Sequence, residues 1–139
     1  MTAQVDHPVI RRPMRFAQWV FTIAGVYGVL ALAPQYFLEK RVGLDHPPAI
    51  THPEYFYGFV GVALAWQVLF LMIGRDPLRL RPAMLAAILE KLSFAVAVPI
   101  LYAQGRVPGM IVGFASIDAL LAVLFAASYW RTRPLTPRD

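Results

Sequence analysis

The sequence contains no cysteine, which excludes disulfides, thiolate catalysis and cysteine-based metal sites. Charged residues are also scarce: they make up 15% of the 139 residues, whereas roughly 25% is usual in soluble domains. So few polar side chains do not cover the surface of a soluble domain of this length. Internal repeats and low-complexity segments are absent from the sequence as well. The composition therefore indicates a single domain that does not belong to the ordinary soluble class.

The net charge of +5 is by itself compatible with binding to nucleic acid. Proteins that bind nucleic acid, however, gather their basic residues on a water-exposed face. Here the basic residues lie in short clusters at the ends of apolar runs. That placement is typical of membrane topology and of attraction to anionic head groups. We therefore expect membrane lipids, and no nucleic acid, as partners.

What the sequence has in abundance is apolar residues, which make up 58% of the chain and form four long runs. Each run has about 20 residues, which at a rise of about 1.5 Å per residue matches a hydrocarbon core of about 30 Å. The runs are apolar on all sides, whereas helices of soluble bundles keep one polar face. The sequence predicts an all-α polytopic membrane protein, a bundle of four transmembrane helices within the single domain 1–139. The expected spans are residues 16–38, 55–74, 82–104 and 109–130, followed by a disordered tail, 131–139.

The first run has an alternative interpretation as a cleaved signal peptide, because the segment Ala31–Ala33 resembles a cleavage site. Pro34 would directly follow the cut, and the run is longer than the apolar region of a typical signal peptide. We therefore expect this run to be retained as a span. Other prolines mark the later runs: Pro53 and Pro82 suit the first position of a helix, and Pro99 predicts a kink.

The distribution of Lys and Arg predicts the orientation. Of the twelve such residues outside the spans, nine lie in the N-terminal segment, the second loop and the C-terminal tail. Cytoplasmic loops carry an excess of Lys and Arg. Both termini are therefore expected in the cytoplasm, and the loops near residues 47 and 107 are expected outside.

Four polar side chains lie well inside the expected spans: Gln67, Glu90, Lys91 and Asp118. Charged groups at this depth are costly, so they turn inward, pair or neutralise. Helix geometry places all four in the cytoplasmic half of the bundle, and we expect Lys91 to pair with at least one of the two acids. Three interpretations remain open: a buried ion cluster that holds the helices in register, a protonatable pocket for a ligand, and a proton or ion pathway.

A second polar group is expected at the outer face and comprises His52, Glu54, Gln104 and Arg106. His52 and Glu54 provide two possible metal ligands, but no third is evident, and a stable site needs more. We therefore expect neither a metal nor a cofactor. The simpler interpretation is that His52 to Glu54 begin a helix and that Glu54 contacts Arg106.

Several stretches together suggest a family. They are His52–Phe59 (HPEYFYGF), Leu64–Gln67 (LAWQ), Leu89–Lys91 (LEK) and Leu101–Arg106 (LYAQGR). In these stretches the chain resembles a family of small bacterial four-span membrane proteins, a resemblance that implies no particular activity. In span number and buried acids it is also similar, more loosely, to DoxX-like and sterol-isomerase-like membrane bundles. The latter hold acidic residues in a pocket, but their motifs are not reproduced here, so no catalytic residue is carried over.

Two functions follow as hypotheses. In the first, Gln67, Glu90, Lys91 and Asp118, with Trp66 beside them, line a pocket for a lipid-like or quinone-like molecule in a bacterial cytoplasmic (inner) membrane. In the second, the protein is an accessory or assembly subunit that associates with other membrane subunits, or with copies of itself, and has no chemistry of its own. The sequence does not decide whether a reaction is catalysed.

Overall fold

The computed structural model describes residues 8–133, with side chains from residue 14 onward, and this part of the chain is all-α without strands. Four of its helices are long and apolar enough to cross a membrane. They are α1 (Pro8–Leu32), α3 (Pro53–Arg75), α4 (Ala83–Ala103) and α5 (Gly109–Arg131). The chain is thus a four-helix bundle with the character of a multi-pass membrane protein.

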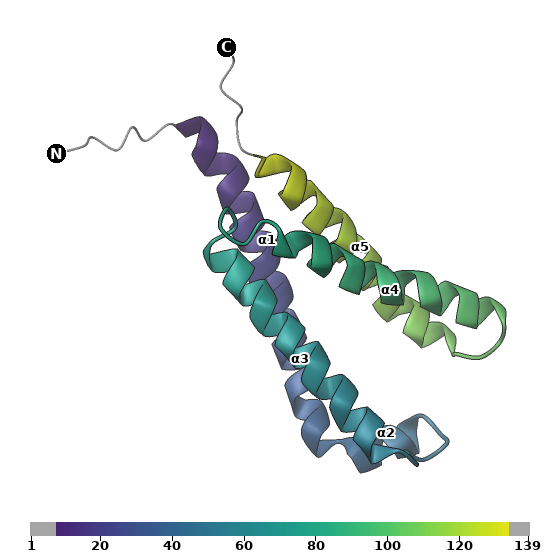
Figure 1. Ribbon diagram of the computed structural model, residues 1–139. Coiled ribbons are helices and arrows are strands. Elements are labelled where there is room, and N and C mark those ends of the chain that lie inside the picture. The colour runs from purple at the N-terminus through teal and green to yellow at the C-terminus, as the bar shows by residue number, and fades with distance from the viewer. Residues whose placement is uncertain (1–7, 134–139) are drawn as a thin grey trace.

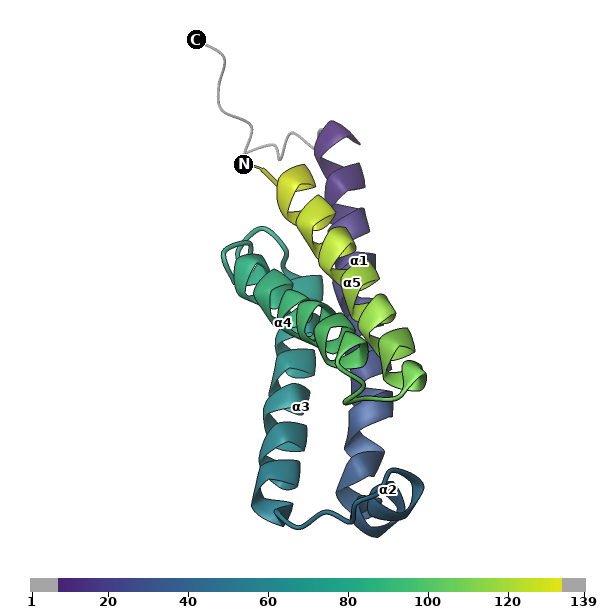
Figure 2. The same cartoon turned by 90° about the vertical axis from the view of Figure 1, so that its right-hand side faces the viewer.

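The four helices form two pairs (Figure 1). Helix α1 packs along α3, and α4 packs along α5, while α1 also contacts α5 and thereby joins the pairs. Helices α3 and α4 touch only slightly, although they are consecutive in the chain. Both views show the start of α1 and the end of α5 at the same end of the bundle (Figures 1 and 2). We call this the terminal end, and the end that carries the α4–α5 turn and α2 (Glu39–Asp45) the loop end.

The first expected span differs from the structure at Pro34. The α-helix ends at Leu32, and a 3-10 helix, η1 (Ala33–Phe37), continues the chain. Proline has no backbone N–H to donate to the carbonyl four residues earlier, and its ring clashes with that carbonyl. The prediction of one regular helix over 16–38 is therefore wrong in its last turn. The apolar segment Met14–Phe37 that includes η1 still has the length of a span.

The short helix α2 has no counterpart in the sequence-based expectation, which placed a loop there. Glu39 occupies its first turn, where a carboxylate is favoured, and Arg41 Nε donates a hydrogen bond of 2.8 Å to Asp45 Oδ2 one turn later. These local interactions, and not an apolar pattern, account for the helix.

The remaining helix ends have identifiable causes. Pro53 opens α3, as expected, and α4 runs past Pro99 to Ala103. Gly105 follows the end of α4 and has a φ of 69°. Glycine adopts this backbone conformation without strain. The expected tail from residue 131 starts too early, because Arg131 is still helical and Thr132 is only 3% exposed. Residues 134–139 of that tail lie outside the described part of the chain.

The core lies where all four long helices meet, toward the terminal end. Phe21 of α1 stacks on Phe125 of α5 with 4.1 Å between ring centroids. Phe70 of α3 packs edge-on against Phe125 at 5.0 Å. Met84 and Ala87 of α4 complete this cluster, and all five residues are fully buried. Aromatic pairs in such arrangements contribute more than their buried area alone.

Candidate functional site

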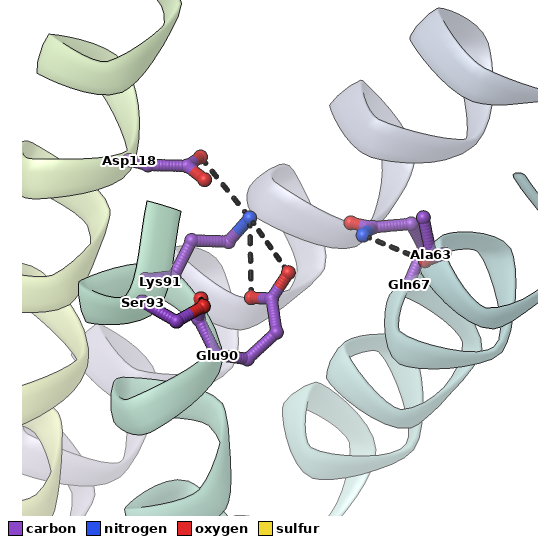
Figure 3. A network of polar contacts seen from close by, with 6 residues as sticks. All are labelled: Ala63, Gln67, Glu90, Lys91, Ser93 and Asp118. Carbon is purple, nitrogen blue, oxygen red and sulfur yellow. Dashed lines mark hydrogen bonds and ion pairs between the residues drawn. The ribbon is translucent and has the colours of Figure 1, made fainter. Parts of the chain in front are cut away.

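Three of the expected polar residues form one cluster on the inner side of the α4–α5 pair (Figure 3). Lys91 Nζ lies 3.1 Å from Asp118 Oδ1 on α5 and 3.3 Å from Glu90 Oε2 on its own helix. The side chain of Lys91 is 9% exposed, that of Asp118 18% and that of Glu90 21%. The expected pairing of Lys91 with an acid is confirmed, and one ammonium group serves two carboxylates.

The Glu90 carboxylate is incompletely satisfied. Its Oε1 accepts a hydrogen bond of 3.5 Å from Lys91 Nζ. Its Oε2 is buried and accepts no hydrogen bond, although it lies within ion-pair distance of the same nitrogen. A buried polar atom without a hydrogen bond costs free energy, more so when it is charged. With both carboxylates ionised and Lys91 protonated, the cluster carries one net negative charge. Glu90 thus retains the capacity to accept a hydrogen bond or a proton.

The Glu90–Lys91–Asp118 cluster lies against the aromatic core. Lys91 Nζ lies 5.5 Å from the centroid of the Phe70 ring on α3, within the range of a cation–π interaction. Ser93 Oγ donates a hydrogen bond of 2.7 Å to the backbone oxygen of Glu90. Sequence reasoning did not select Phe70, although it follows Gln67 by three residues and therefore shares its helix face. The contact shows that α3 reaches the cluster through an aromatic ring.

Gln67 is buried but does not join the cluster, contrary to the expectation that it lines one pocket with the charges. Its Nε2 donates a hydrogen bond of 3.0 Å to the oxygen of Ala63, one turn earlier on α3 (Figure 3). Its amide group lies against Gly28 of α1, where an added Cβ would overlap it. The close approach of α1 to α3 at Gly28 therefore determines the position of the Gln67 side chain.

Trp66 is half-buried and packs against the aromatic core, with its ring centroid 6.3 Å from that of Phe70. The structure therefore supports a candidate site of Glu90, Lys91 and Asp118, with Phe70 beneath it. Gln67 and Trp66 lie on the neighbouring helix α3 and outside the charged group.

The outer polar group is two separate contacts. His52 Nδ1 lies 3.0 Å from Glu54 Oε1 at the start of α3, and both side chains are exposed. Arg106 Nη1 donates a hydrogen bond of 3.4 Å to Gln104 Oε1 in the α4–α5 turn. The expected Glu54–Arg106 contact is wrong, because the two helix pairs diverge and carry these residues on different turns (Figures 1 and 2). Within residues 14–133, no three His, Asp or Glu side chains gather as a metal site would require.

The sequence did not indicate two polar contacts that lie outside the interior of the spans. Arg81 stacks on the Tyr129 ring at 3.7 Å and donates hydrogen bonds of 3.2 and 3.1 Å to the Tyr129 carbonyl oxygen. Tyr57 Oη donates a hydrogen bond of 2.7 Å to Glu39 Oε2, which attaches α2 to α3. Both join residues more than fifteen positions apart, so no local pattern indicates them.

Comparison of the chain with protein-family models, curated proteins and solved structures finds no match in any of the three. Membership of the four-span family that the sequence resembles therefore stays a prediction. The Glu90–Lys91–Asp118 cluster is thus the feature of the described structure that bears on function.

Proposed function

We propose that this protein is a small multi-pass protein of the bacterial cytoplasmic membrane that binds a lipid-like or quinone-like molecule at the Glu90–Lys91–Asp118 cluster. The observation that carries the proposal is the buried Glu90 Oε2, which accepts no hydrogen bond. A ligand with a hydroxyl group, such as a quinol or a lipid alcohol, supplies the missing donor. The apolar body of such a ligand matches the apolar helices around the cluster.

The competing interpretation is a purely structural ion cluster. It accounts for the Lys91–Asp118 pair, which joins α4 to α5. It does not account for a second carboxylate, which leaves the group with one net negative charge in a medium of low dielectric constant when both acids are ionised and Lys91 is protonated. A cluster that only connects two helices needs one acid. The second acid is therefore assigned to the ligand.

The test is to purify the protein gently and identify what accompanies it by native mass spectrometry and by analysis of an organic extract. We expect one small apolar molecule per chain. Glu90→Gln replaces a charged acceptor with a neutral one. Charged hydrogen bonds are stronger by an amount that corresponds to about tenfold in the dissociation constant, so we expect weaker binding and a lower occupancy in this variant. The matched control is Glu54→Gln, which neutralises an exposed carboxylate at the loop end and leaves occupancy unchanged.

Other outcomes contradict the proposal. Stoichiometric partner proteins without a small molecule would favour the accessory-subunit hypothesis. Equal occupancy in the Glu90→Gln and wild-type proteins would remove the cluster from the binding site.

The orientation is a further part of the proposal and rests on the distribution of basic residues. Reporter fusions after residue 78 and at the C-terminus are expected to report a cytoplasmic location, and fusions near residues 47 and 107 an external one. A cytoplasmic signal at residue 47 would contradict the four-span topology.

A further inference from the structure

A surface hollow lies on α1 near the terminal end of the bundle, well away from the charged cluster. Its lining consists of Arg15, Gln18, Trp19 and Thr22. These positions are three and four residues apart, so they share one face of the helix and lie one above another. Every one of the four side chains carries a hydrogen-bond donor, and none carries a negative charge. The lining thus selects for an anion or for a group rich in acceptor oxygens.

The donors of this hollow are not used within the described part of the chain. Ser116, Ser128 and Thr132 each donate to the carbonyl oxygen four residues earlier. The Gln18 amide has no such bond to any residue from 14 to 133, and Arg15 has no carboxylate partner there. The Thr22 hydroxyl is directed at the α1–α3 contact, where it lies against Gly74. Arg15 and Gln18 can therefore donate to an acceptor outside the protein.

An apolar stripe continues the same face of α1 beyond the hollow. Trp19, Ile23, Val26 and Leu30 follow at intervals of four, three and four residues. They are 66%, 59%, 46% and 71% exposed. This face of α1 therefore changes along its axis from a cation and neutral donors at one end to large apolar side chains at the other. That order matches a molecule with an anionic head and an acyl chain.

Depth along the helix agrees with this match. The apolar span begins at Met14, so Arg15 lies at its edge. The head-group layer on each side of a bilayer is roughly 5–8 Å thick, and a long arginine stem can reach across the boundary into it. Trp19 lies four residues further in, or about 6 Å along the axis, close to the interface where its ring is favoured.

We propose that this hollow binds one anionic phospholipid. Arg15 pairs with the phosphate, Gln18 donates hydrogen bonds to phosphate or ester oxygens, and an acyl chain lies along Ile23 and Val26. Charge complementarity and the apolar stripe favour a lipid over a soluble anion, because a soluble anion has no apolar part to contact the stripe. The site is independent of any ligand at the Glu90–Lys91–Asp118 cluster.

The experiment measures lipid binding to the purified, delipidated full-length protein in detergent, by native mass spectrometry and by thermal stability. The probes are phosphatidylglycerol, phosphatidylcholine with identical acyl chains, and soluble glycerol phosphate. We expect one phosphatidylglycerol to bind more tightly than phosphatidylcholine and to raise the midpoint of thermal unfolding. Arg15→Gln weakens that binding about fivefold, because one basic residue near anionic lipid contributes about this much.

Two matched controls separate a defined site from general surface attraction. Arg79→Gln removes an exposed charge elsewhere and leaves the tight binding event in place. Gln18→Leu removes the amide at similar side-chain size and weakens binding, whereas Gln104→Leu at the loop end does not. If Arg15→Gln reduces the yield of folded protein, the comparison of the two leucine variants still decides the question.

Three results would overturn the assignment. Phosphatidylglycerol and phosphatidylcholine could bind equally well, which would remove the anionic requirement. Arg15→Gln and Arg79→Gln could weaken binding equally, which would leave only general electrostatics. Glycerol phosphate could compete at concentrations similar to the lipid, which would identify a soluble anion as the ligand.

Discussion

The two helix pairs are joined by different physical means. Helices α1 and α3 approach closely because glycines lie at their contact. An added Cβ at Gly25 would meet Leu71 at 2.7 Å, and one at Gly74 would meet Thr22 Oγ1 at 2.5 Å. Between α4 and α5 the polar contact is an ion pair, Lys91 to Asp118, at 3.1 Å. Small buried residues such as Ala87 and Ala122 contribute there as well.

This contrast shows how helices associate when the solvent is as apolar as their surfaces. Burial of apolar groups provides no driving force between helices in lipid, so close packing and polar contacts must supply it. The α1–α3 pair uses close packing and buries one neutral amide, Gln67. The α4–α5 pair encloses three charged groups and retains an unsatisfied oxygen. Within the described residues, the buried charged groups thus belong to the α4–α5 pair, and the closest glycine contacts belong to the α1–α3 pair.

The largest expected effect comes from Lys91→Met, which leaves two buried carboxylates without their cation. Breaking a buried ion pair from one side costs about 3–5 kcal/mol of stability. We expect a large drop in the midpoint of thermal unfolding in detergent, and loss of α4–α5 packing before that of α1–α3.

The companion variant for this test neutralises all three groups, Lys91→Met with Glu90→Gln and Asp118→Asn. It should recover most of the lost stability, since no uncompensated charge remains. An unchanged midpoint in Lys91→Met alone would show that Lys91 is already solvated and that the pair contributes nothing.

A smaller effect is expected from Gly28→Ala in the other pair. The new methyl group overlaps the Gln67 amide, and overpacking of a tight contact costs about 1–3 kcal/mol. Gly58→Ala is the matched control, because an added Cβ there meets nothing within 4 Å. Adding Gln67→Ala to Gly28→Ala should restore part of the stability. Equal midpoints for the Gly28 and Gly58 variants would contradict glycine-dependent packing of α1 on α3.

Arg81→Lys tests the terminal end of the α4–α5 pair. Lysine keeps the charge but loses the planar group that stacks on Tyr129 and donates twice to its carbonyl oxygen. We expect a loss of about 1 kcal/mol in the free energy of unfolding. Arg79→Lys, at an exposed position of the same loop, should have no effect, and a similar loss in both variants would argue against the specific contact.

The smallest effect is expected from Arg41→Gln at the loop end, where the Arg41–Asp45 pair is exposed. Hydrogen bonding to Asp45 raises the pKa of Arg41, so Arg41 stays protonated and its contribution to this pair does not change between pH 5 and 9. Solvent screens such pairs, and we expect no measurable change in the unfolding midpoint. If Arg41→Gln lowered the unfolding midpoint as much as Lys91→Met does, exposed and buried ion pairs would contribute equally to stability, contrary to our expectation.

Parts of the candidate site were predictable from the sequence and parts were not. Lys91 has to meet an acid because a charge so deep in the membrane requires a partner, and this holds for any arrangement of the helices. The sequence did not indicate that Gln67 faces Gly28 and not the charges, because that depends on the rotation of α3 about its axis. The Glu54–Arg106 expectation failed because it assumed parallel helix pairs.

The sequence by itself determined that the chain is helical, that four segments are long and apolar enough to span a bilayer, and that Lys91 within them had to pair with at least one acid. Composition decides these points because lipid leaves backbone and charged groups no partners except those within the protein. The divergence of the two pairs, the Phe21–Phe70–Phe125 core and the unsatisfied oxygen of Glu90 were decided only by the tertiary structure. These features depend on how side chains from distant segments fit against each other, and close packing distinguishes arrangements that hydrophobicity alone leaves equivalent.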